Sequence, residues 1–183
     1  MKIRALFFAT AILPALCVST LAYSKEEQML KVATFNVSME ATNYKALGTK
    51  PSNKVLQHVL STGEHPQVKN IAEIIQRINP DILLLNEFDY IADKRKGVEA
   101  FIENYLNVSQ QGLEPIDYPY TYVAPVNTGE PTTFDLDNNG KAEGIGGDAY
   151  GFGLYPGQYG MALLSKYPID VDGIRTFQTF KWH

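Results

Sequence analysis

Two polar residues in this sequence stand just after apolar residues. Asn36 directly follows an aromatic residue, and Glu87 follows four consecutive aliphatic residues with one position between. A carboxylate or carboxamide partly withdrawn from water costs free energy unless something pairs with it. A divalent cation is a suitable partner, because Mg²⁺ is bound by carboxylate and amide oxygens together with waters and phosphate oxygens. The alternative is structural, with Asn36 capping a turn and Glu87 paired with Lys94 or Arg95. Residue types and spacing leave both interpretations open.

The elements around this pair follow from hydrophobic periodicity. Residues 30–38 form an apolar-rich run typical of a buried strand, and residues 82–85 are four aliphatic residues, typical of a strand covered on both faces. Between them, residues 67–78 repeat apolar side chains at intervals of three and four, which predicts an amphipathic helix that begins at Pro66 and ends before Pro80. Because a helical crossover makes the two strands parallel, their carboxyl ends share one edge of the sheet, where ligands bind.

Further elements are expected along the chain, with no internal repeat and no interdomain linker. Helical spacing recurs over residues 98–106, and residues 121–125 and 159–169 are predicted strands. Residues 173–180 are expected to begin a partner strand for the last of these. The long connection after the first strand is expected to contain a short helix around residues 55–60.

An acidic cluster suggests a second cation site. Asp135, Asp137 and Asn139 precede a glycine, and Glu143 is a further candidate ligand, a pattern that resembles the opening of a calcium loop. The twelfth loop position is Gly146 rather than the Glu that an EF-hand requires, so we do not expect an EF-hand. A looser Ca²⁺ loop and a solvated acidic turn both stay open.

The segment that contains this cluster, residues 126–158, is rich in glycine. It holds eight of the fourteen glycines, and structureless connections of this length inside a compact domain are usually functional or disordered. Aromatic residues cluster in and just after its second half. They either line a substrate cleft or pack the long loop onto the domain; they are Tyr150, Phe152, Tyr155 and Tyr159.

The first residues have the layout of a secretory signal peptide. Two basic residues precede an apolar run over residues 5–16, which is shorter than the roughly 20 residues that span a bilayer, and small residues follow. We predict a leader over residues 1–24 and a bacterial periplasmic or secreted protein. The surroundings of Cys17, the only cysteine, do not fit a lipid attachment site. Because Cys17 is removed with the leader, we expect neither a disulfide nor a thiolate ligand in the mature chain.

The charge balance argues against nucleic-acid binding by charge alone. The chain has 16 basic and 20 acidic residues, and loss of Lys2 and Arg4 with the leader leaves 14 against 20, a net charge of −6. The length fits one domain.

Three segments together resemble the endonuclease/exonuclease/phosphatase superfamily, which includes pancreatic deoxyribonuclease and neutral sphingomyelinases. They are Phe35 with Asn36, residues 80–87, and residues 160–168. The resemblance implies an α/β (α+β) fold, a four-layer sandwich of two mixed β-sheets flanked by helices. Residues 25–183 would be the first part of such a domain. It also implies that Asn36 and Glu87 hold Mg²⁺ or Mn²⁺, with Glu87 as the direct ligand.

The implied chemistry is phosphoester hydrolysis by a metal-activated water. In this family the catalytic base and its histidines come from a second half, so we expect the catalytic residues downstream of His183 and a fragment that is inactive alone. His58 and His65 match no catalytic motif of the family and are expected at the surface. The substrate would be a phosphate ester, whether nucleic acid, phospholipid or small molecule. No protein partner and no membrane span after signal cleavage are predicted. The rival hypothesis is a non-catalytic exported protein that binds calcium.

Overall fold

The computed structural model describes residues 29–46 and 48–180. The predicted leader, Cys17 and His183 lie outside these residues. A four-stranded mixed sheet has the order β1-β2-β4-β3. Its strands are β1 (Val32–Met39), β2 (Ile82–Phe88), β3 (Tyr120–Val123) and β4 (Met161–Ser165). The helices are α1 (Asn53–Thr62), α2 (Pro66–Ile78) and α3 (Val98–Phe101), which continues as a π-helical turn over Ile102–Leu106; two 3-10 turns cover Ala41–Asn43 and Lys94–Lys96.

The strand–helix–strand unit predicted from the sequence is confirmed. β1 and β2 pair in parallel, and the connection between them contains α1 followed by α2. Pro66 occupies the first turn of α2, where its missing N–H is not needed. Asn79 ends the helix in the left-handed region with φ 48°, and its backbone N–H donates to the Ile75 carbonyl at 2.7 Å. Local sequence therefore determines where this helix begins and ends.

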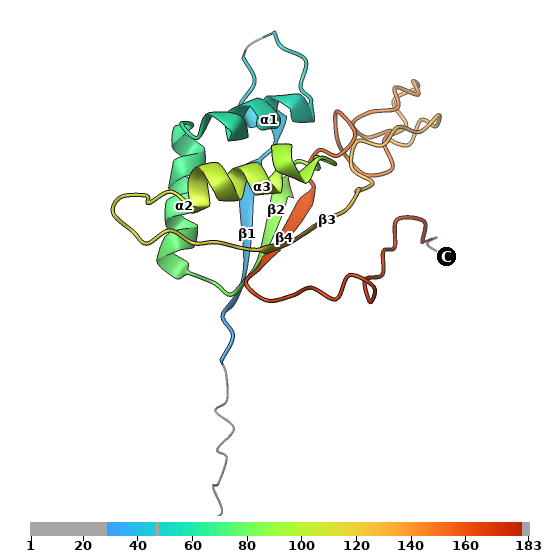
Figure 1. The fold of residues 1–183 in the computed structure, drawn as a ribbon. Helices are drawn as coiled ribbons and strands as arrows, with labels where there is room; N and C mark the ends of the chain where they lie inside the picture. Colours follow the sequence, from blue (N-terminus) through green and yellow to red (C-terminus); the bar gives the residue numbers. More distant parts are fainter. Residues whose placement is uncertain (1–28, 47, 181–183) are drawn as a thin grey trace, which may run out of the picture.

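All three helices cover one face of the sheet (Figure 1). Every second residue of the central strands points into this core, as Leu83, Leu85 and Leu164 do, each at most 1 % exposed. Burial of a leucine side chain stabilises the fold by about 2 kcal/mol relative to its exposure. The α1 residues Leu56 and Leu60 are also fully buried, which confirms the short helix expected in the first long connection.

The prediction that residues 173–180 begin a partner strand is wrong. β4 already pairs with β2 on one side and β3 on the other, so no free edge of β4 is left for another strand. This segment instead runs without regular secondary structure along the face of the sheet opposite the helices (Figure 1). The described residues thus form one mixed sheet with helices on one face, an α/β fold, and the four-layer arrangement stays a prediction.

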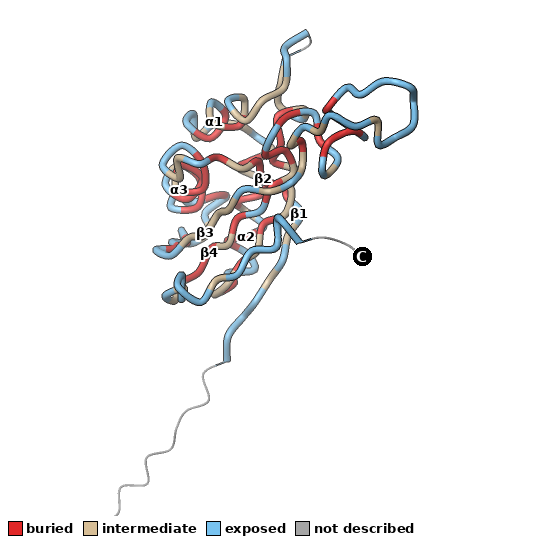
Figure 2. The backbone as a smooth tube through the Cα atoms, turned by 90° about the vertical axis from the view of Figure 1, so that its right-hand side faces the viewer, coloured by how far each residue is buried: buried red, intermediate tan, exposed pale blue. Residues whose placement is uncertain are grey.

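The glycine-rich segment, residues 126–158, forms an arm that projects from the end of the sheet (Figure 1). Short bridges hold its two limbs together, for example between Thr128 and Gly151. The limbs cross so closely at Gly129 that an added Cβ would lie 1.8 Å from the Tyr155 carbonyl oxygen. In Figure 2 the outer loop of the arm is exposed and its base is buried. The arm is therefore a packed structure at its base.

Within residues 29–46 and 48–180, no helix combines the length and the apolar character needed to cross a bilayer.

Candidate metal-binding site

Asn36 and Glu87 lie at the carboxyl ends of adjacent parallel strands, and Ser38 connects them. The Ser38 hydroxyl lies 3.4 Å from Asn36 Oδ1 and 3.5 Å from Glu87 Oε2. The backbone N–H of Ser38 also donates to Asn36 Oδ1 at 3.1 Å. An amide oxygen and a carboxylate oxygen therefore converge on one point, although 51 positions separate the two residues. Sequence reasoning missed Ser38, because a serine at a strand end carries no distinctive signal.

The backbone of this site is strained. Six non-glycine residues of the described chain have positive φ, and three of them are here: Ser38 at 48°, Glu87 at 54° and Tyr159 at 56°. The register between β1 and β2 shifts between Asn36 and Met39, so the strands are irregular where the polar residues point outward. Such conformations cost about 1–3 kcal/mol each and cluster at functional sites. The strain marks this sheet end as a candidate site independently of residue type.

The structural alternative for this pair holds only in part. Asn36 does cap a local turn through Ser38, as that alternative expected. The predicted ion pair of Glu87 with Lys94 or Arg95 is wrong, however. Lys94 donates to the Thr121 carbonyl at 2.8 Å, and Arg95 pairs with Asp93 at 3.2 Å. Among the described residues, no basic side chain forms a salt bridge with Glu87.

Two further carboxylates lie buried beside the pair. Asp89 is fully buried; its Oδ2 accepts hydrogen bonds from the Ala41 N–H at 3.0 Å and from the Tyr155 hydroxyl at 2.7 Å. Oδ1 of Asp89 has no hydrogen bond of ordinary geometry to any described residue, and the Tyr159 amide faces the carboxylate. Burial raises the pKa of Asp89 to about 7, against the lowering effect of the Tyr155 hydroxyl and the Ala41 amide.

Glu40 is the second buried carboxylate, 2 % exposed. It accepts hydrogen bonds from the backbone N–H and hydroxyl of Thr42 and, at 2.7 Å, from Nε2 of Gln158. All its donors are neutral. Burial raises the pKa of the nearby Tyr159 hydroxyl, and the negative charges of Glu40, Glu87 and Asp89 raise it further. The end of the sheet therefore has a negative electrostatic field that no described cation neutralises.

These residues fit a hard divalent cation. The converging donors, Asn36 Oδ1 and Glu87 Oε2, are oxygens, and Mg²⁺ and Mn²⁺ prefer oxygen ligands to nitrogen or sulfur. A small cation would also neutralise the local negative field, because buried charges in proteins are usually paired or bound to metals. The donor set, the geometry and the sign of the charge agree.

The acidic cluster of the arm differs from the predicted loop. Asp135, Asp137 and Asp148 each offer a carboxylate oxygen within 4.8 Å of the others. Asn139 is bonded beside this group: its Nδ2 donates to Asp137 Oδ2 at 3.1 Å, and its side-chain oxygen accepts from the Lys141 N–H at 2.9 Å. Glu143 participates only through its backbone N–H, which donates to Asp148 Oδ2 at 2.8 Å.

Asp148 was not predicted as a member of this cluster. It is 1 % exposed, and its Oδ1 accepts from the backbone N–H groups of Leu136 and Asp137. The backbone hydrogen bond from Glu143, followed by those from Leu136 and Asp137, lowers the pKa of the Asp148 carboxyl. Its place in the cluster depends on the fold of the arm, since it stands eleven positions after Asp137 without a recognised spacing.

The two described histidines lie on the helical side of the fold. His58 is exposed on α1, as expected. His65 is not a simple surface residue: its ring packs edge-on against Tyr44 with centroids 4.8 Å apart, and its Nδ1 is buried without a partner among the described residues. Neither side chain hydrogen-bonds to Asn36, Ser38 or Glu87.

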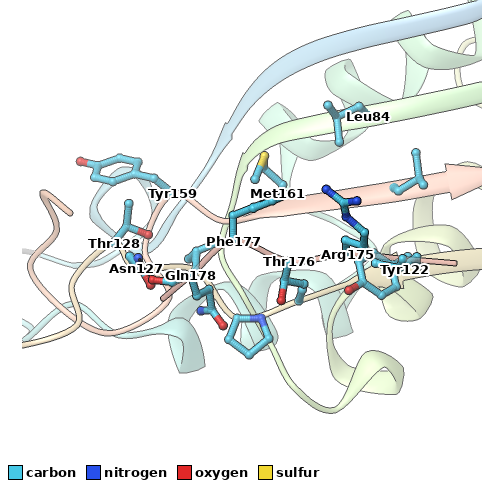
Figure 3. A pocket seen from close by; sticks show the side chains of 15 residues that line it. Leu84, Tyr122, Asn127, Thr128, Tyr159, Met161, Arg175, Thr176, Phe177 and Gln178 are labelled. Atoms are coloured by element: carbon cyan, nitrogen blue, oxygen red, sulfur yellow. Dashed lines mark hydrogen bonds between the residues drawn. The ribbon is translucent and has the colours of Figure 1, made fainter. Parts of the chain in front are cut away.

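A cavity of about 560 Å³ lies on the open face of the sheet (Figure 3); Asn36, Ser38 and Glu87 are not among its lining residues. Its floor is apolar and includes Leu84 and Met161, and the C-terminal segment with Arg175 and Phe177 forms another wall. Of the four clustered aromatic residues named above, Tyr159 alone lines it. Tyr155, at the base of the arm, is buried, while Tyr150 and Phe152 are exposed. The packing interpretation therefore applies to Tyr155, and the substrate-cleft interpretation stays a prediction for Tyr159.

The comparison with protein families agrees with the geometry. The model of the endonuclease/exonuclease/phosphatase family matches residues 33–183, and the chain belongs to this family. Membership implies a hydrolase that acts on phosphoester bonds. No match was found among curated proteins or among solved structures.

Proposed function

We propose that this protein is a metal-dependent phosphoesterase in which Asn36 and Glu87 hold Mg²⁺ or Mn²⁺. The observation that carries this proposal is the convergence of Asn36 Oδ1 and Glu87 Oε2 on the Ser38 hydroxyl. The strained backbone at Ser38 and Glu87 and the absence of a salt bridge to Glu87 in the described residues support it.

The residues have distinct roles in this proposal. Glu87 is the direct carboxylate ligand and Asn36 supplies an amide oxygen. Ser38 orients both, through its backbone N–H to Asn36 Oδ1 and its hydroxyl to Glu87 Oε2. A metal held by these residues would supply charge neutralisation at the phosphoryl oxygens and activation of a water. No described residue is assigned as the catalytic base, so we expect the isolated chain to bind metal and to hydrolyse phosphodiesters negligibly.

The predicted leader makes this an exported enzyme, either periplasmic or secreted. Its substrate belongs to the class of phosphate esters. Sequencing the amino terminus of the mature protein after export tests the leader, with a new terminus near residue 24 expected.

The second candidate function is calcium binding by a non-catalytic exported protein. The grouping of the Asp135, Asp137 and Asp148 carboxylates favours it. The two functions are compatible in one chain, since the arm cluster and the strand-end pair are built from different residues.

Mn²⁺ binding, followed by electron paramagnetic resonance of the free ion, tests the proposal. Both variants below carry Asp137→Asn, which weakens Mn²⁺ binding at the arm. Glu87→Gln should reduce affinity at least tenfold, because it removes the direct anionic ligand while keeping the side-chain shape. Glu103→Gln, on the exposed side of the π-helical turn, is the matched control and should leave the affinity unchanged.

Equal affinity in the two variants would overturn the assignment of Glu87. Robust hydrolysis of a chromogenic phosphodiester by the isolated chain, abolished by Glu87→Gln, would keep the metal site and overturn the expectation of negligible turnover.

A further inference from the structure

The end of the arm and the two residues after it are hydrogen-bonded to the chain that follows the candidate site. The Phe88 N–H donates to the Gly160 carbonyl at 3.0 Å, and the Tyr90 N–H donates to the Gly157 carbonyl at 2.8 Å. Gly160 is needed for this approach, because an added Cβ would lie 2.6 Å from the Phe88 carbonyl oxygen. These contacts place residues 157–160 directly against the chain that follows Glu87.

Two buried side chains from the end of the arm, Tyr155 and Gln158, reach the carboxylates behind the site. The Tyr155 hydroxyl donates to Asp89 Oδ2 at 2.7 Å and accepts from the Ala41 N–H at 2.8 Å. Gln158 donates through Nε2 to Glu40 Oε2 at 2.7 Å and accepts through Oε1 from the Leu154 N–H at 2.7 Å. Gln158 is fully buried and Tyr155 is 6 % exposed. The Tyr155 hydroxyl thus both donates and accepts, and both polar atoms of the Gln158 amide are bonded.

The two carboxylates bound in this way each follow a site residue at the same spacing along the chain. Glu40 comes two positions after Ser38, and Asp89 comes two positions after Glu87. Ser38 and Glu87 both have left-handed backbone, a conformation that persists only where the surrounding structure fixes it. The hydrogen bonds of Gln158 and Tyr155 fix the chain immediately after each of these two residues.

We propose that Tyr155 and Gln158 are positioning residues for the metal-binding pair. Tyr155 acts through Asp89 on Glu87, and Gln158 acts through Glu40 on Ser38, so the arm sets the distance between the two ligand oxygens. This inference rests on the proposed function, because it assigns outer partners to that same site. Outer partners of this kind orient the direct ligands and tune their affinity.

Mn²⁺ affinity of the full chain tests the inference with a pair of tyrosine variants. Tyr155→Phe removes the hydroxyl that bonds Asp89 and Ala41, while the ring stays in place. Tyr118→Phe is the matched control: its hydroxyl is equally buried and donates to the Pro80 carbonyl at 2.9 Å, near the opposite end of β2. All variants carry Asp137→Asn, and melting temperatures in EDTA report the cost of each change to the metal-free fold.

We expect Tyr155→Phe to weaken Mn²⁺ binding about tenfold and Tyr118→Phe to leave it within twofold of the parent, although both lower the melting temperature. Unchanged affinity in Tyr155→Phe, or an equal loss in both variants, would overturn the positioning role. Absence of Mn²⁺ binding by the parent would overturn the proposed function itself, which is a different result.

If Tyr155→Phe fails to fold, Gln158→Met tests the other bond, since it keeps a similar side-chain volume without the donor. The expected loss in Mn²⁺ affinity is again about tenfold. Failure of both variants to fold while Tyr118→Phe folds would overturn positioning in favour of a purely structural role.

Discussion

The two ends of the sheet treat their carboxylates in opposite ways. At the end where β1 and β2 begin, Asp81 accepts from the Lys31 backbone N–H at 2.8 Å and pairs with Lys166 Nζ at 3.1 Å. Both bonds lower the pKa of the Asp81 carboxyl, and the bond from the Lys31 N–H has the larger effect. At the end where these strands finish, Glu40 and Asp89 bond to neutral donors only.

We interpret Asp81 as a structural carboxylate, and Glu40 and Asp89 as carboxylates that support the proposed metal site. Asp81 is neutralised by lysine and needs nothing more. The opposite end gathers the carboxyl groups of Glu40, Glu87 and Asp89, and no basic side chain of the described residues forms a salt bridge with them, at a cost in stability. A protein tolerates this arrangement where a bound cation completes it, which is the role proposed for Mg²⁺ or Mn²⁺.

The largest effect expected from this comparison concerns stability. Gln158→Ala leaves the buried Glu40 carboxylate without its Nε2 donor, so the free energy of unfolding should fall by about 3 kcal/mol. Lys166→Ala, at the other end, should cost clearly less, because Lys166 and Asp81 both remain in contact with solvent. Urea unfolding at neutral pH measures both values. A cost for Gln158→Ala no greater than that for Lys166→Ala would remove the distinction between the two ends.

A smaller effect is expected from calcium at the arm, which extends from the same end of the sheet. Calcium at ten times its dissociation constant should raise the melting temperature by about 4 °C if the Asp135, Asp137 and Asp148 cluster binds it. Asp137→Asn should abolish most of this shift, and differential scanning calorimetry measures it. An unchanged melting temperature in the parent protein would identify the cluster as a solvated acidic turn.

The smallest effect concerns acid pH at the neutralised end. The pKa of Asp81 is lower in the folded state than in the unfolded chain. The Asp81 carboxylate therefore stabilises the fold above the ordinary Asp pKa of about 3.9, and this stabilisation is lost as the pH falls below that value. The parent should therefore lose more stability than Asp81→Asn between pH 5 and pH 3. Thermal melts across this range compare the two proteins, and parallel losses would contradict the assignment.

Local sequence predicted the elements that carry the site with good accuracy. The apolar spacing over residues 67–78 and the proline at its start are local properties, and they produced α2 and the parallel pair of β1 and β2. The same reasoning placed Asn36 and Glu87 at one edge, since the direction of parallel strands follows from the crossover helix. The predicted strand at residues 173–180 failed because strand pairing depends on which edges are free, and β4 had none.

The side-chain partners of the site were beyond reach of the sequence. Gln158 and Glu40 are 118 positions apart, and Tyr155 and Asp89 are 66 apart. Nothing in the spacing of these residues indicates that they meet. Asp148 escaped prediction for the same reason, since the arm folds back before its carboxylate reaches Asp135 and Asp137.

The sequence by itself therefore determined the periodic elements, their direction and two candidate ligands, because hydrophobic spacing, proline and glycine act on neighbouring residues. The tertiary structure alone decided that Ser38 lies between these ligands, that the backbone of Ser38 and Glu87 is left-handed and that the arm is bonded to the carboxylates behind them. Those features arise from contacts between segments far apart in the chain, which form only when the whole sheet and the arm have packed together.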